Sequence, residues 1–543
     1  MQDKMCDVGA VSNTDTFIKR GAYNTETATS WSWGALKNVN YFIDGCNDPK
    51  YCTVEAETRD NYLGIARWFR AWFYYDKLTT YGEVPWFPND IQSYQNDVMY
   101  KDRDSRDVII RNLIADLDFA YEHIQATSST GSATLTRWAA AALKSRVCLF
   151  EAAYRRYHNL TGLEITPEEL YREAAKAAKL VIDNSGCSLN TAAGKKGAYR
   201  DLFYSETPLT QEVILAVCAN EKSGIFGEQN WWFNARSYGL CWSLVRSFVH
   251  TYLKQDGTPF TAAADYAVKS FAEEMEGRDL RLEQTVRGRN FLWDGKTAVA
   301  DIKNLSLTGY QVIKYTLDES KYDGGAKNIN SIPLIRYAEV LLNYAEAQAE
   351  LGVITDSEWA LTVGALRKRA GITGGTETLP TTVDSYLQRT FYPDVTSPVL
   401  LEIRRERAIE LVAEGMRFDD LRRWKCGSLM ETLPWSGIHI PGLEQPVDVN
   451  GDGVNDYYFT EGEVASAPAA YKNIAVRVNQ DGVGLYAEAN AVSGYDLVYK
   501  TGAGDRYWYP DGRQYLYPIP AKVIRDYRNA GYTISQNPEW DNE

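Results

Sequence analysis

Apolar residues recur at a helical spacing through the N-terminal two-fifths of the chain. In "NYLGIARWFRAWFYYDKLTTYG", apolar positions from Leu63 to Leu78 repeat about every 3.6 residues, and the pattern stops at Gly82. "DVIIRNLIADLDFAYEHI" and "TRWAAAALKSRVCLFEAAYRRYH" follow, separated by the polar breaker "QATSSTGSATL". A further stretch opens with Thr166 as N-cap and Glu169 three residues later, which is the spacing of a capping box. This succession predicts helices packed as hairpins.

The helical pattern returns after a long irregular segment. "IPLIRYAEVLLNYAEAQAELG" carries small residues at Ala345, Ala347 and Ala349, which let a partner helix approach closely, and "DSEWALTVGALRKRAG" is the natural partner. The pair has the length of a tetratricopeptide hairpin without its full consensus. Between the two helical regions, "EVILAVCA" predicts a short buried strand, and "GIFGEQNWWFNARSYGLCWS" has no clear period and predicts a long loop.

We therefore predict a mainly α fold with a tetratricopeptide-like helical hairpin scaffold and an irregular, loop-rich ligand-binding half. A single domain is expected over 1–543. Its scaffold is predicted at roughly 60–186 and 334–425, and its loop-rich portion at roughly 187–333 and 426–543.

The segment "IRRERAIELVAEGMRFDDLRRW" concentrates charge on one predicted helix. Glu402, Glu406, Glu410 and Glu414 are spaced four residues apart, with arginines among them. Such a face is typical of a solvated lattice of ion pairs, each contributing about 0.3 to 0.5 kcal/mol. Carboxylates on one helical face do not oppose each other across a cleft, as a catalytic pair would. The segment is therefore predicted to have a structural role and not a catalytic one.

Charge and cysteine usage narrow the classes of function. Lys and Arg number 58 against 72 Asp and Glu, and the net charge of −14 argues against binding to nucleic acid. No apolar run is long enough to cross a bilayer, and "MQDKMCDVGA" lacks the apolar core of a signal peptide, so any targeting segment is expected outside this chain. Cys46 and Cys52 flank a turn and can pair in an oxidising compartment only if their geometry permits it, which spacing does not decide.

Several motifs together resemble the SusD/RagB family of glycan-binding outer-membrane lipoproteins of Bacteroidetes-type bacteria. They occur in the family's order and span essentially the whole chain: "RWFRAWFYYDKLTTYGEVPWF", "RWAAAALKSRVCLFEAAY", "EVILAV", "IPLIRYAEVLLNYAEAQAELG", "RRERAIELVAEGMRFDDLRRW", "YLYPIP" and "QNPEW". The resemblance implies a non-catalytic cell-surface protein that binds a polysaccharide or oligosaccharide. It also implies a lipid anchor on an N-terminal cysteine and delivery of ligand to a SusC-like TonB-dependent transporter. Cys6 follows "DKM", which is not a lipobox, and is not assigned as the anchor.

Two other classes stay open. The chain has no G-x-S-x-G, H-E-x-x-H, C-x-x-C or P-loop motif, and its four histidines are widely spaced. A glycoside hydrolase with an unrecognised Asp/Glu pair leaves no such motif, however, and a helical-repeat scaffold that binds only protein needs none.

The aromatic loop "GEQNWWFNARSYGLCWS" is the predicted glycan platform. Aromatic side chains make up 13% of the chain, and this loop alternates rings with hydrogen-bonding groups, as sugar recognition requires. Trp242 also begins an apolar stretch and has an alternative role in the core. The predicted glycan-binding residues are Trp231, Trp232, Tyr238, Trp242, Asn230, Asn234 and Arg236.

"DVNGDGVND" predicts a structural calcium site. Its oxygen donors stand at positions 1, 3, 5, 7 and 9 of a calcium loop, and Gly453 permits the sharp turn at position 6. Phe459 replaces the bidentate glutamate expected at position 12, so a solvated turn without an ion remains an equal alternative. The predicted ligands are Asp448, Asn450, Asp452, Val454 and Asp456.

Overall fold

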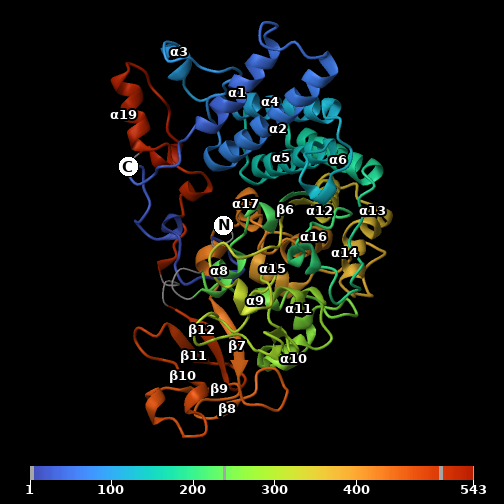
Figure 1. Ribbon diagram of the computed structural model, residues 1–543. Helices are drawn as coiled ribbons and strands as arrows, with labels where there is room; N and C mark the ends of the chain where they lie inside the picture. Colours follow the sequence, from blue (N-terminus) through green and yellow to red (C-terminus); the bar gives the residue numbers. More distant parts are fainter. Residues whose placement is uncertain (1–4, 236–239, 501–504, 542–543) are drawn as a thin grey trace.

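Helices are the predominant secondary structure, and the two three-stranded sheets gather at one end of the molecule (Figure 1). The computed structural model describes residues 5–235, 240–500 and 505–541. Over these ranges, no helix combines the length and the apolar character needed to span a bilayer. The N-terminal helices are α1 (Gly34–Asn47), α2 (Ala56–Tyr81), α3 (Asn96–Met99), α4 (Arg106–His123), α5 (Arg137–Tyr157) and α6 (Pro167–Asn184).

Local sequence explains where these helices begin and how closely they pack. The capping box of α6 is present, because Thr166 accepts from the Glu169 amide at 3.2 Å and the Glu169 carboxylate accepts from the Thr166 amide at 2.7 Å. The run Ala139–Ala142 is buried, and its small side chains let α5 lie against both α4 and α6. The helix α2 packs on α1 and α4 and ends at Gly82, whose φ of 75° favours glycine.

The second helical region joins the same core. Its first helix, α12, packs against α5 and α6 on one side and α16 on the other, and this arrangement confirms the mainly helical fold predicted from periodicity. The tetratricopeptide-like character of the hairpins stays a prediction. The helices of this region are α12 (Tyr337–Glu350), α13 (Asp356–Leu361), α14 (Val363–Arg369), α15 (Ser385–Phe391), α16 (Pro398–Glu410), α17 (Arg417–Arg423) and α18 (Leu429–Thr432).

Between the helical regions the chain forms short elements. The predicted strand β2 (Val213–Val217) is present and pairs antiparallel with β6 (Ile332–Arg336). The described part of the segment predicted as a loop includes a short helix, α8 (Gln229–Asn234), which is too short to show a period. The remaining elements are α7 (Asp201–Tyr204), α9 (Arg246–Val249), α10 (Phe271–Met275), α11 (Arg281–Thr285), β4 (Leu292–Trp293) paired with β5 (Lys296–Thr297), and β3 (Ser243–Leu244) paired with β1 (Gly9–Ala10).

The C-terminal region first builds small sheets and then returns to the N-terminal helices (Figure 1). One sheet has the order β11-β12-β7, and the other has the order β10-β9-β8, in which β10 and β9 are parallel. The last helix, α19 (Ala521–Asn529), lies beside α1 and α3. The strands are β7 (Ser436–Ile440), β8 (Pro446–Val447), β9 (Tyr457–Thr460), β10 (Ala475–Arg477), β11 (Leu485–Ala489) and β12 (Tyr495–Tyr499).

The glutamates of α16 and of the turn that follows it are buried, which corrects the expectation of a solvated face. Glu410 is fully covered and accepts hydrogen bonds from Arg281, Arg336 and Arg369 at 2.9, 3.0 and 2.5 Å. Burial alone would raise the pKa of Glu410, but the three guanidinium groups outweigh it and hold the pKa well below its usual range. The i, i+4 pattern is the same for a solvated and a buried face. Here α11, β6 and α14 supply the covering arginines.

The N-terminal segment is also part of the core. Asp7 is fully buried and accepts two hydrogen bonds from Arg417, at 2.8 and 2.6 Å. Cys6 beside it is 3% exposed.

Candidate functional site

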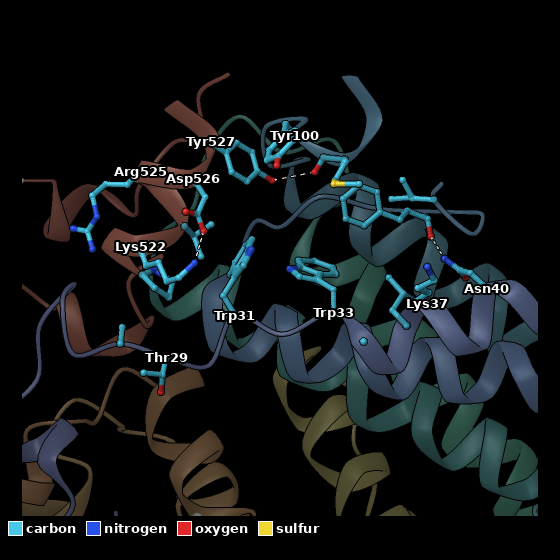
Figure 2. A pocket seen from close by; sticks show the side chains of 18 of the residues that line it. Thr29, Trp31, Trp33, Lys37, Asn40, Tyr100, Lys522, Arg525, Asp526 and Tyr527 are labelled. Carbon is cyan, nitrogen blue, oxygen red and sulfur yellow. Dashed lines mark hydrogen bonds and ion pairs between the residues drawn. The ribbon is translucent and has the colours of Figure 1, made fainter. Parts of the chain in front are cut away.

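A cavity of about 840 Å³ opens between the two ends of the chain (Figure 2). Its floor is the segment before α1 together with the first turns of that helix, and its opposite wall is α19 with the end of α3. Its size falls within the range of small-ligand sites, which are concave and largely apolar with a few polar groups. The cavity is therefore the first candidate for the functional site.

Two tryptophans from the sequence "SWSWG" stand in this cavity. Trp31 and Trp33 are half-buried, and their rings meet edge to face at 5.2 Å and 73°. Both point to the same side because alternate residues of a non-helical segment share a face (Figure 2). Trp33 packs further on Phe87, and Trp31 packs on Tyr81, at 5.3 and 4.9 Å. These contacts fix the two indoles before any ligand arrives.

The opposite wall is also aromatic. Tyr100 packs perpendicular to Tyr527 at 5.1 Å and stacks on Tyr532 at 5.3 Å. The Tyr527 hydroxyl is directed at the carbonyls of Met99 and Lys101, at 3.4 and 3.3 Å, and burial raises its pKa to about 12. The tyrosine therefore stays neutral and offers a ring, with no negative charge, to the cavity.

Charged groups stand at the rim in compensated pairs. Lys522 binds Asp526 at 2.6 Å and Arg525 binds Glu26 at 2.6 Å, whereas Lys37 has no ion pair among the described residues. Figure 2 shows Lys37, Lys522, Arg525 and Asp526 at the edges of this cavity. The rim thus supplies hydrogen-bond donors and acceptors with little net charge, which suits a hydroxyl-rich ligand.

Asn40 supports the wall from behind. It is buried and donates to the carbonyls of Phe87 and Asn89, at 2.8 and 3.1 Å, while its own carbonyl accepts from Arg70 at 3.4 Å. These bonds hold the segment that follows α2 against α1. Asn40 is therefore a positioning residue for the cavity.

The predicted platform on α8 divides into buried and exposed parts. Asn230 is fully buried and bonds to the main chain of Leu317 in both directions, at 2.7 and 2.8 Å, so it organises the core. Trp242 is 2% exposed and packs over Gly9, where a Cβ would meet its ring at 2.5 Å. Both residues are corrected from ligand-binding to structural, because neither side chain is accessible.

Trp231 and Trp232 remain at the surface. Trp232 is 37% exposed and meets the half-buried Trp231 edge to face at 4.9 Å. Asn234 donates to Asp323 at 3.1 Å and accepts from Gln311 at 3.2 Å, which fixes it in place. Arg236 and Tyr238 lie outside the described residues. The surviving part of the predicted platform is thus a pair of indoles on a short helix.

Sequence reasoning missed the first cavity. Trp31 and Trp33 stand two residues apart in the Ser/Thr-rich stretch "TETATSWSWG", just before a helix. Two indoles in an otherwise polar segment are the local signal that points to them. Their distant partners on α19 give no such signal.

In the predicted calcium loop, aspartate side chains accept hydrogen bonds from main-chain amides of the same loop. Asp448 accepts from the amides of Gly451 and Gly453, at 2.7 and 2.8 Å, and Asp456 accepts from the Val449 amide at 2.8 Å. Burial raises the pKa of Asp456, the Val449 amide opposes the rise, and the two neighbouring carboxylates add to it. Those neighbours are Asp448 and Asp452.

The remaining predicted ligands lie in the same loop. Asn450 donates to Asp452 at 3.1 Å, and Asp452 accepts from the Val454 amide at 2.9 Å. Within the ranges the structure describes, no three or more His, Cys, Asp and Glu side chains form a metal-binding group. The predicted donor set also uses an amide and a main-chain carbonyl, and the calcium site stays a prediction.

Cys46 and Cys52 are both free thiols in the structure. Burial raises the pKa of Cys46, and the adjacent Cys52 thiol, which hydrogen-bonds to it, adds to the rise. The spacing "CNDPKYC" therefore does bring the two sulfurs together.

Comparison with known proteins decides the family. The SusD family model matches residues 211–540, which is more than half of the chain. The chain belongs to the SusD family. This SusD-family assignment confirms the resemblance carried by the ordered sequence motifs. No curated protein sequence matches the chain significantly.

Solved structures share the fold over nearly the whole chain. A SusD-like protein from Bacteroides fragilis NCTC 9343 matches with a TM-score of 0.66 at 21% identity, covering 99% of this chain and 92% of that one. A SusD-like carbohydrate-binding protein from the same organism gives 0.68 at 18% identity, covering 98% and 91%. A laminarin-binding SusD-like protein gives 0.57 at 15% identity, covering 99% and 93%. These likenesses establish the SusD fold of the chain.

Proposed function

We propose that this SusD-family protein binds a glycan without cleaving it, and that the ligand lies against Trp31 and Trp33. The observation that carries the proposal is the pair of pre-positioned indoles in a cavity of about 840 Å³. Pyranose rings present C–H faces that pack on aromatic rings, and their hydroxyls need donors and acceptors at the rim. The family's carbohydrate-binding members support the same ligand class.

The indole pair on α8 is the competing glycan surface. Trp231 and Trp232 lie on a short helix of the loop-rich half, well away from α1 and α19 (Figure 1). The first cavity is favoured because it surrounds a ligand on several sides, whereas no cavity described here is lined by either indole of α8. Binding energy concentrates where a ring is buried in a pocket.

Affinity electrophoresis against a panel of polysaccharides tests the proposal. The double variant W31A/W33A should bind polysaccharide about tenfold or more weakly and so migrate with less retardation. W231A/W232A should be retarded as strongly as the parent protein. Because Trp33 also packs on Phe87, the melting temperature of each variant is measured beside binding. Full retention by a folded W31A/W33A protein would move the site to α8. Release of reducing ends, abolished by one Asp or Glu substitution, would favour the hydrolase.

We further propose that the protein is lipid-anchored at the cell surface of the outer membrane and delivers its ligand to a SusC-like TonB-dependent transporter. Membership of the SusD family supports this proposal. A pull-down from native membranes should recover such a transporter. Recovery of other proteins only, together with no retardation by any glycan, would favour a protein-binding scaffold.

We also propose a structural calcium ion in the loop from Asp448 to Asp456. Its support is the crowding of three carboxylates in one turn, two of which raise the pKa of the third. A cation binding there would stabilise the folded state by mass action. Chelator should lower the melting temperature and calcium should restore it, and the double variant D448N/D452N should not respond. An unchanged melting temperature in the parent protein would leave the loop a simple turn.

A further inference from the structure

The turn that follows α1 brings two cysteines from either side of it together. Helix α1 ends because Asp48 leaves the helical conformation, with φ and ψ of −89° and 114°, and Pro49 has no amide proton to continue the hydrogen-bond ladder. The Cys52 amide then donates to the Asp48 carbonyl at 3.0 Å, and the Asp48 carboxylate accepts from the Lys50 amide at 2.8 Å. The chain therefore folds back, and Cys52 approaches Cys46 in the last turn of α1.

The two sulfurs are in contact at this turn. The Cys52 thiol hydrogen-bonds to the Cys46 thiol. Other cysteines of the chain donate to main-chain carbonyls instead: Cys218, Cys241 and Cys426 do so at 3.2, 3.6 and 3.4 Å. Both members of the pair are free thiols and only half-buried, so a dissolved oxidant can reach them.

Two neighbouring thiols suit either a metal ion or a disulfide bond. A structural zinc ion takes four ligands from Cys, His, Asp and Glu side chains. Within the described ranges, no three such side chains form a group that could hold a metal ion, so the pair lacks the further ligands. Burial raises the pKa of Cys46, the Cys52 thiol adds to the rise, and the Arg59 guanidinium opposes it. Cys46 is therefore mostly protonated at neutral pH, which argues against an isolated reactive thiolate.

We propose that Cys46 and Cys52 form a disulfide bond that closes the turn after α1. Each thiol loses its hydrogen when the S–S bond forms. The oxidant is itself a disulfide, such as oxidised glutathione, which accepts two electrons and two protons and becomes two thiols. Disulfide bonds persist in oxidising compartments, so the presence of this bond in the native protein rests on the cell-surface location proposed above.

The bond fastens the end of α1 that supports the rim of the first cavity. Asp44, on the last turns of α1, accepts from the Asn89 side chain at 2.8 Å and from the Asp90 amide at 2.7 Å. Asn89 lines that cavity. The side chains of residues 53–58, which lead into α2, are exposed and contribute little packing. A disulfide at the turn therefore anchors a connection that packing alone holds weakly.

Peptide mapping of the full chain tests the proposal. Trypsin cleaves after Lys37, Lys50 and Arg59, so each thiol of the pair falls on its own peptide, 38–50 or 51–59. The reduced chain is incubated with oxidised and reduced glutathione at about pH 8, and its remaining thiols are alkylated with iodoacetamide before digestion. Mass spectrometry should find the two peptides linked, with a mass lower than their sum by two hydrogens. Dithiothreitol should separate them.

Comparison with the unfolded chain distinguishes a bond favoured by the fold from one favoured only by closeness in sequence. The equilibrium constant for forming the bond with glutathione should be about tenfold or more greater in the folded chain than in urea, because the turn already holds the thiols together. Cys52→Ser is the control, and its Cys46 should carry only glutathione or the alkyl group. Unlinked peptides from the folded, oxidised chain, or a constant no greater than in urea, would overturn the proposal.

The native protein provides a separate measurement. Thiols are alkylated on intact cells before lysis, and the purified chain is mapped in the same way. The linked peptides should already be present. If the two cysteines are alkylated separately although glutathione links them in the purified chain, the bond in the native protein and the cell-surface location are overturned together. Polysaccharide retardation enters neither measurement, so failure of the glycan site is distinguishable from failure of the disulfide.

Discussion

At the scale of single residues, His158 makes stability depend on pH. It is stacked on Tyr154 at 4.0 Å, and its Nε2–H donates to the Arg422 carbonyl at 2.8 Å. Burial lowers its pKa to about 4. The neutral form is therefore favoured in the folded protein, so stability is fully present above the unfolded pKa of about 6.5 and is lost as the pH falls toward 4. Between pH 6.5 and 5 the loss should be about 2 kcal/mol. Urea unfolding of the parent protein and of His158→Gln at both pH values measures it, and parallel pH dependences in the two proteins would contradict the assignment.

At the scale of elements, the buried glutamates of α16 join that helix to α11 of the loop-rich half and to β6 and α14. Arg281 from α11, Arg336 from β6 and Arg369 from α14 all converge on Glu410. Glu410→Gln keeps the shape but leaves buried guanidinium charge uncompensated, and should cost about 3 to 5 kcal/mol in urea unfolding. Glu402→Gln is the matched control and should cost less, because Glu402 lies at the end of the row and its side chain is 10% exposed. A Glu410→Gln protein within about 1 kcal/mol of the parent would show that the arginines find other partners.

At the scale of the whole molecule, one hydrophobic cluster runs from Met5 to Trp540 and includes both helical regions. The single domain expected from the sequence should therefore unfold in one cooperative transition, with calorimetric and van't Hoff enthalpies equal. Scanning calorimetry, with far-ultraviolet and tryptophan signals recorded in parallel, checks this. Two separated transitions would assign the scaffold and the loop-rich half to independent units.

The features that could be predicted from the sequence depend on residues close together in the chain. The capping residues of α6 and the apolar period of α2 act within a few positions, so those helices were predictable. The burial of Glu410 was not, because the covering arginines come from three other elements. The first cavity was not predictable either, since Trp31 and Tyr527 line it together only after both ends of the chain have folded. In the aromatic loop the sequence analysis found the surface indoles Trp231 and Trp232 but also included Trp242, because residue type does not reveal which rings the core covers.

The pairing of Asp7 with Arg417 has a consequence for synthesis. These two residues are 410 positions apart, and their ion pair is buried. Asp7 therefore has no ion-pair partner until Arg417 has left the ribosome. Contacts of such long range slow folding and leave apolar segments exposed in the meantime. During its biogenesis this chain should depend on chaperones that protect the segment around Asp7 until Arg417 is available.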